Sequence, residues 1–187
     1  SELIIHAPEI IGRRIFDLCS IDPDILNPSF DVLRKTIDKT LEISKNWKKA
    51  KPKLVVHLGG MSLYKVEPYH MVLQNKMERV IDNFKKIDYS PDDIEIIPEN
   101  LPSRPWYLGG EWHQYSFAPV NDMITFCEYF NLKMTYDICH AKLYCNDYGV
   151  DLLDYTKSIK NYISHLHISD ALGVNAEGLQ IGTGEID

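Results

Sequence analysis

Short apolar runs alternate with helix-like segments along this chain of 187 residues. Five of the runs have the composition of buried strands, and each leads into a polar residue that can bind a divalent metal. These polar residues are His6, His57, Glu99, Asp137 and His167. Near-continuous apolar strands separated by amphipathic helices are typical of a parallel sheet covered by helices. The pattern therefore predicts an α/β protein with five polar side chains at the carboxyl edge of its sheet.

Helices are predicted over residues 28–47, 68–87, 119–130 and 151–160. The first should begin with Asn27 as its N-cap and Pro28 in its first turn. Residues 100–117 and the glycine-rich tail 171–187 are expected to be loops at the same edge, and a short loop should follow Asp137.

Length sets a limit on the architecture. A closed eight-stranded (β/α) barrel needs ~200 to ~250 residues, and only five strands are clear. An open doubly wound sheet is an alternative, but the polar strand ends follow one another in series. We expect one domain over residues 1–187, a TIM-type barrel incomplete at both ends and a fragment of a longer barrel, because a further helix and strand would be expected after Asp187.

The composition limits the kinds of binding partner and the cellular location that we expect. The formal net charge is −7, from 20 basic and 27 acidic residues, whereas proteins that bind a phosphate backbone carry basic surfaces. The charge therefore argues mildly against a nucleic acid partner without excluding one, because bound metals can supply local positive charge. No apolar stretch approaches the ~18 residues of a membrane span. The four cysteines form no CxxC pair, and a cytoplasmic location is expected.

Three of the strand ends suit a divalent metal. Glu99, Asp137 and His167 offer two carboxylates and one imidazole, a set that fits Mn²⁺, Mg²⁺, Fe²⁺ or Zn²⁺. His140 can turn back over the strand end towards the same site, and Asp170 can orient an imidazole or contact substrate. Any one of these residues alone is more simply a polar strand end that caps a loop, but together they favour a metal site.

Two earlier strand ends have less certain roles. His6 and His57 could complete a second metal site, bind a sugar hydroxyl, or only fix a loop. In the loop 100–117, Trp106 and Trp112 could stack on a sugar or serve as packing anchors. Arg13, Arg14 or Arg104 could hold a phosphate, and nothing in the sequence selects among them.

Several motifs together resemble those of the xylose isomerase-like barrel superfamily, which includes sugar isomerases, sugar epimerases and endonuclease IV proteins. The motifs are Glu99-Asn100, Asp137-Ile138-Cys139-His140, His167-Ile168-Ser169-Asp170 and Ile181-Gly182-Thr183-Gly184. The resemblance runs from His6 to about Asp187. It implies that Glu99, Asp137 and His167 are metal ligands and that His140 contacts substrate or metal. By the same resemblance, His6 and His57 match strand-end histidines of the endonuclease branch.

The chain departs from the family pattern in two places. A glutamate on the last strand usually supplies a fourth ligand, and this chain ends before reaching it. The endonuclease branch has a D-x-H motif where Ala176-Glu177-Gly178 stands here. That difference speaks against a three-metal site and against phosphodiester chemistry.

The sequence therefore favours a metal-dependent sugar or sugar-phosphate isomerase or epimerase of carbohydrate metabolism, using Mn²⁺, Mg²⁺ or Zn²⁺. Proton transfer would pass through a metal-stabilised enediolate. Glu99 and His140 are the expected catalytic residues, and His6, His57, His140 and Asp170 are expected to bind substrate. One alternative is an endonuclease IV-like phosphodiesterase acting on abasic DNA. Another is a non-catalytic metal-binding domain, whose open sheet edges could pair in a homo-oligomer.

Overall fold

The computed structural model describes residues 2–47, 50–63 and 75–187. Its main sheet has five parallel strands: β1 (Ile4–His6), β4 (Lys53–Val56), β6 (Glu95–Pro98), β10 (Met134–Asp137) and β11 (Ile163–His167). β1, β4 and β6 are hydrogen-bonded in that order, and β10 pairs with β11. A single parallel bridge between Glu99 and Thr135 joins the two groups. The strands therefore lie side by side in chain order, as in a TIM-type barrel.

The sheet is curved but does not close among the described residues. Lys53 of β4 donates a hydrogen bond from Nζ to the carbonyl oxygen of Ser164 in β11, at 3.3 Å, although β6 and β10 lie between these strands. At the other end, the rings of His6 and His167 lie 5.9 Å apart. The first and fifth strands thus face each other across the concave side. This confirms the predicted incomplete barrel.

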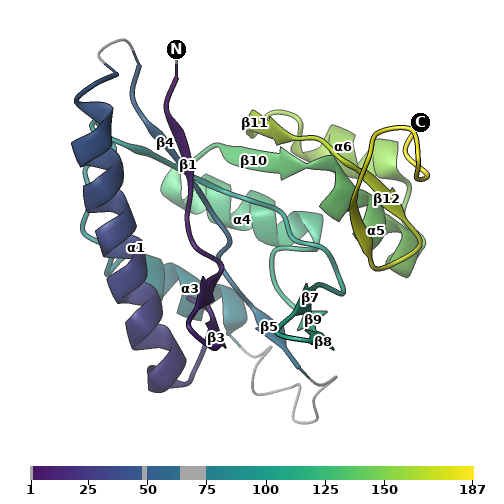
Figure 1. Cartoon of the computed structure of the whole chain (residues 1–187), viewed down its shortest axis with the longest axis horizontal. Helices are drawn as coiled ribbons and strands as arrows, with labels where there is room; N and C mark the ends of the chain where they lie inside the picture. The colour runs from purple at the N-terminus through teal and green to yellow at the C-terminus, as the bar shows by residue number, and fades with distance from the viewer. Residues whose placement is uncertain (1, 48–49, 64–74) are drawn as a thin grey trace.

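Five helices are described: α1 (Pro23–Ser44), α3 (Lys76–Phe84), α4 (Val120–Phe130), α5 (Ile138–Tyr148) and α6 (Leu152–Ile159). Figure 1 shows α1 flanking β1 and β4, with α5 and α6 beside the C-terminal part of the chain. The helices predicted over 119–130 and 151–160 are confirmed. The one predicted over 68–87 is helical from residue 76, and its first part lies outside the described residues. No described helix is long and apolar enough to cross a membrane.

The start of α1 differs from the prediction. The helix begins at Pro23, and the side chain of Asp22 caps it by accepting a hydrogen bond from the backbone N–H of Asp24 at 2.8 Å. Pro28 therefore lies inside the helix rather than at its first turn. Because proline has no N–H, the carbonyl of Asp24 loses its partner four residues on. The guanidinium of Arg14 donates to that carbonyl instead, which explains how Pro28 is tolerated.

The segment after Asp137 was also predicted wrongly, because it forms α5 and not a short loop. Asp137 caps this helix through its side chain, which accepts a hydrogen bond from the N–H of His140 at 2.9 Å. Gly149 ends it in the left-handed conformation, with φ of 66°. A helix starting directly at a strand end fixes His140 one turn from Asp137.

The predicted loops contain short antiparallel strands. Residues 100–117 include β7 (Trp106–Tyr107), β8 (Gly110–Glu111) and β9 (His113–Gln114), and the tail includes β13 (Ala176–Leu179) paired with β12 (Asp170–Leu172). Two further short pairs are β2 (Ile10–Ile11) with β3 (Arg14–Ile15), and β5 (Met61–Ser62) with β9. In Figure 1, β7, β8 and β9 gather beside β5.

The core lies between the convex face of the sheet and the helices. Leu54, Val56 and Ile96 of the central strands are fully buried. Phe84 of α3 packs edge-on against Phe126 of α4, with ring centroids 5.1 Å apart. Cys127, predicted to be a core residue, is buried in this cluster. This packing holds α3 and α4 against the sheet and keeps the strand ends in register.

Candidate metal centre

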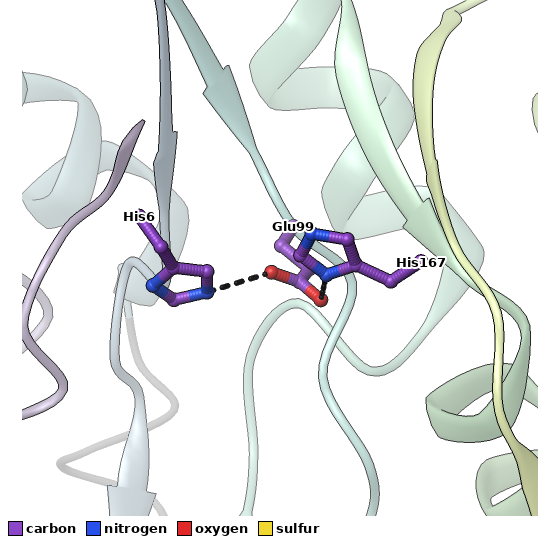
Figure 2. A group of neighbouring side chains, drawn as sticks. All are labelled: His6, Glu99 and His167. Carbon is purple, nitrogen blue, oxygen red and sulfur yellow. Dashed lines mark hydrogen bonds and ion pairs between the residues drawn. The ribbon is translucent and has the colours of Figure 1, made fainter. Parts of the chain in front are cut away.

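Glu99 stands at the middle of a ring of imidazoles at the carboxyl edge of the sheet. Its side chain is 1% exposed. Its Oε2 accepts hydrogen bonds at 3.1 Å from Nε2 of both His6 and His57, and its Oε1 lies 2.7 Å from Nδ1 of His167. Figure 2 shows His6 and His167 approaching the carboxylate from opposite sides. The strand ends after β1, β4, β6 and β11 therefore converge on one carboxylate.

Asp137 and His140 are held beside Glu99 by a buried amide. The side chain of Asn100, which is fully buried, accepts a hydrogen bond from the N–H of Asp137 at 2.8 Å and donates one to its carbonyl at 2.9 Å. His140 donates through Nδ1 to the carbonyl of Asn100 at 2.8 Å, and this nitrogen lies 3.7 Å from Oε1 of Glu99. Asn100 thus fixes the relative positions of two expected site residues, a role that the sequence reading did not assign to it.

The three residues expected to ligate the metal come together. Nδ1 of His167 lies 2.7 Å from Oε1 of Glu99 and 3.9 Å from Oδ2 of Asp137. Ligand atoms of Glu99, Asp137 and His140 lie within 4.8 Å of one another, as do those of His6, Glu99 and His167. The expected set is therefore one connected cluster of nitrogen and carboxylate donors.

The carboxylate and the imidazoles of the cluster stabilise one another's charged forms. Burial disfavours the charged form of Glu99, but hydrogen bonds from His167, His57 and His6 outweigh this and lower its pKa. Burial likewise opposes protonation of His6, while its hydrogen bond to Glu99 raises its pKa. The hydrogen bond to Glu99 raises the pKa of His167. Burial raises the pKa of Asp137. The carboxylate of Glu99 thus favours the protonated forms of the His6 and His167 imidazoles.

Two carboxylates near the cluster were missed by the sequence reading. Glu9 lies in the loop after β1, with Oε1 3.8 Å from Nε2 of His6 and 3.7 Å from Nδ1 of His57. Glu177 of β13 places Oε1 3.1 Å from Nε2 of His140. Neither stands directly at the end of a strand of the main sheet. The one available signal was that Glu177 occupies the place of a metal-binding motif in related sequences.

Among the described residues, Asp170 makes no hydrogen bond to the histidines that surround Glu99; its partners are backbone groups of the tail. Its two carboxylate oxygens accept four hydrogen bonds, from the backbone N–H groups of Ala171, Gly182, Gly184 and Ile186. No described side chain of the cluster is hydrogen-bonded to it. Asp170 therefore holds the C-terminal tail in place through these hydrogen bonds. The contact between Asp170 and substrate stays a prediction.

One buried nitrogen tests whether the residues of the cluster fit a cation. Nδ1 of His57 is buried and has no hydrogen-bond partner among the described residues, although such atoms are normally satisfied. It points towards Glu9, at a separation too long for a hydrogen bond. His6 is oriented by donation from Nδ1 to the carbonyl of Ala7 at 2.7 Å, which leaves Nε2 facing the site. This arrangement of orienting hydrogen bonds is typical of metal-binding histidines.

A curved parallel sheet with this donor cluster at its carboxyl edge defines a TIM-type barrel protein with a candidate divalent metal centre. The chain belongs to the xylose isomerase-like TIM barrel family, whose model matches residues 2–187. No sequence among curated proteins matches it.

Solved structures share its fold. Endonuclease IV from Thermus thermophilus superposes with a TM-score of 0.55 at 15% identity, covering 94% of this chain and 55% of that one. D-allulose 3-epimerase from Methylomonas sp., in complex with D-allulose, gives a TM-score of 0.55 at 15% identity and covers 92% of this chain and 52% of that one. The chain thus spans just over half the length of these proteins. Identity at this level shows the fold alone, and the two neighbours have different activities.

Proposed function

We propose that this protein is a metal-dependent sugar or sugar-phosphate isomerase or epimerase. The observation that carries the proposal is the arrangement around Glu99, a buried carboxylate that accepts hydrogen bonds from His6, His57 and His167. Imidazole and carboxylate donors on one edge of a barrel suit a cation that also binds substrate oxygens. A D-allulose 3-epimerase shares the fold, so this reaction class is one that the fold can carry.

The residues present fit the metal. Glu99, Asp137 and His167 would hold it, with Mn²⁺, Mg²⁺ or Zn²⁺ matching this mixture of donors. When bound, the metal would supply a Lewis acid that polarises the carbonyl of the substrate.

The side chains around the metal ligands would handle the proton and the hydroxyl groups. Glu99 would remove the proton next to the substrate carbonyl, because hydrogen bonds from the surrounding imidazoles keep it ionised despite its burial. His140, His57 and His6 would orient hydroxyls. Glu177, on the other side of His140 from Glu99, would add a second carboxylate for proton return. Carboxylates and imidazoles alternate around the site, which suits a neutral polyol better than a phosphate backbone.

A second candidate is an endonuclease IV-like phosphodiesterase acting on abasic DNA. One observation favours it: His6, Glu9 and His57 form another donor group, which shares His6 with the group of His6, Glu99 and His167. Adjacent metal sites are typical of phosphodiester hydrolysis. The excess of acidic residues argues against a DNA partner.

A cytoplasmic location is part of the proposal. All four cysteines are free thiols and buried, which suits a reducing compartment. A second copy of the chain could pair with the open sheet edges.

The two candidate functions are tested in parallel on one preparation. The purified chain is loaded with Mn²⁺ and incubated in D₂O with a panel of ketoses and ketose phosphates, and separately with an abasic-site duplex. We expect solvent deuterium to enter a ketose at the carbon next to its carbonyl, and the duplex to stay intact. Glu99→Gln should abolish exchange, whereas the exposed Glu128→Gln should not. Cleavage of the duplex without exchange would establish the second candidate instead.

A further inference from the structure

A cavity of about 170 Å³ lies between the β2–β3 hairpin and the segment that carries β7 and β8. Its apolar lining comes from Ile15, Ile25, Met61, Leu108 and Trp112. Arg13, Arg14 and Asp17 complete the lining. An apolar cavity of about 150 Å³ is large enough to bind benzene. The size and lining therefore match one ring-sized apolar group.

Leu108, one of the lining residues, has a strained backbone conformation. Leu108 and Gly109 form the two-residue turn between β7 and β8, with φ of 54° and 81°. Two positive φ angles in such a turn favour Asn-Gly, and a leucine there is strained. The side chain of Leu108 is also 50% exposed. Strained residues that persist tend to serve as ligand clamps, and a contact made by this side chain would explain its presence.

The three arginines considered for anion binding differ in their partners among the described residues. Arg14 donates to the carbonyl of Asp24, and Arg104, the third arginine considered for anion binding, is held by two hydrogen bonds to Asp147. Arg13 has no hydrogen bond or ion pair to any described residue, whereas Asp17 is occupied by the N–H groups of Cys19 and Gly60. The cavity therefore combines an apolar interior with Arg13, a cation that has no partner among the described residues, beside Arg14, which is held by a backbone carbonyl.

The cavity is linked to the candidate metal centre. Tyr107, next to Leu108, donates a hydrogen bond through its hydroxyl to Oε2 of Glu9 at 2.7 Å. The other oxygen of Glu9 faces His57 and His6. The hairpin that carries Leu108 is thus fastened to the edge of the metal centre. A ligand in the cavity would contact the turn next to Tyr107, the residue that bonds to Glu9.

We propose that this cavity binds the non-reacting end of the substrate, an aryl or similar ring-sized apolar group with an anionic substituent that pairs with Arg13. The inference rests on the proposed function only in treating the ligand as part of a substrate. Trp112 and Leu108 would enclose the ring, with Met61 against it.

Binding of benzoate to the metal-free protein tests this without turnover. Saturation-transfer NMR should give saturable binding of benzoate, tighter than that of neutral benzyl alcohol. Leu108→Asn suits the turn better than leucine, so its melting temperature should be equal or higher. Its affinity for benzoate should nevertheless fall about tenfold, which corresponds to about 1.4 kcal/mol. Arg13→Gln should remove the preference for benzoate over benzyl alcohol.

The control separates this proposal from the one above. Glu99→Gln should bind benzoate like the wild type, even if no ketose exchanges deuterium. Absence of saturable binding, or an unchanged affinity in Leu108→Asn, would overturn the assignment of the cavity. Equal affinity for benzoate and benzyl alcohol would overturn the role of Arg13.

Discussion

Glu177 holds the imidazole of His140 from the side opposite to the backbone of Asn100. Nε2 of His140 donates to Oε1 of Glu177 at 3.1 Å, while Nδ1 donates to the carbonyl of Asn100 at 2.8 Å. Since both partners only accept, both ring nitrogens carry protons. Burial opposes this charge, but the hydrogen bond and charge of Glu177, with Asp137 and Glu99, raise the pKa of His140 to about 10.

Replacing Glu177 should therefore lower the pKa of His140. In Glu177→Gln the amide oxygen still accepts a hydrogen bond but carries no charge. We expect the pKa of His140 to fall by about one unit or more, measured by NMR titration of the ring in metal-free protein. The exposed Glu128→Gln is the matched control. An unchanged titration of His140 in Glu177→Gln would contradict the pairing.

Asp17 should make stability depend on pH. Burial raises its pKa to about 7, although its carboxylate accepts hydrogen bonds from Cys19 and Gly60. Its ordinary value is 3.8, so the folded state favours the protonated form. The free energy of unfolding should therefore fall as pH rises from about 4 to about 7, and level off above that.

Urea unfolding at several pH values tests this window. Asp17→Asn keeps an oxygen for both N–H groups but cannot ionise. The variant should lose the decline between pH 4 and 7 and should unfold at higher urea than the wild type at pH 8. Asp92→Asn, on the exposed surface, should behave like the wild type. A decline of equal size in Asp17→Asn would show that another group causes it.

Asp170 should control the order of the tail. Its four accepted hydrogen bonds come from backbone N–H groups, and those of Gly184 and Ile186 contribute most to lowering its pKa to about 2. Asp170→Asn replaces one oxygen with an N–H group that cannot accept. We expect faster amide exchange over residues 182–186 and a lower urea midpoint, with Glu185→Gln as the control. Unchanged exchange with weaker sugar binding would instead support the substrate contact predicted from the sequence.

The sequence was sufficient to predict the strands and the identity of most of the cluster. Apolar runs such as Lys53–Val56 are short and continuous, and their polar ends follow directly, so His57 and Glu99 could be placed at one edge. Parallel pairing then brings these ends together without further information. This is why the residues of the main sheet were found.

The prediction was wrong for two helices, α1 and α5, whose extent depends on tertiary contacts. Asp22-Pro23 and Asn27-Pro28 are equally good helix starts, and only the bond from Arg14 to Asp24 reveals that Pro28 is tolerated inside α1. α5 has a weak apolar stripe and was read as a loop.

The two missed carboxylates come from segments that the strand pattern does not cover. Glu9 stands in a loop after β1, and Glu177 on a hairpin outside the main sheet. Both approach the cluster only in three dimensions, so no strand-end spacing marks them, and only the motif position of Glu177 could have drawn attention to it.

The central claim is that the cluster around Glu99 binds a divalent metal, and titration of the metal-free protein with Mn²⁺, followed by electron paramagnetic resonance, tests it most directly. The account predicts saturable binding by the wild type and an affinity at least about tenfold lower in Glu99→Gln, equivalent to about 1.4 kcal/mol. Glu128→Gln should match the wild type. Absence of saturable binding by the folded wild type, or equal affinity in Glu99→Gln, would contradict it.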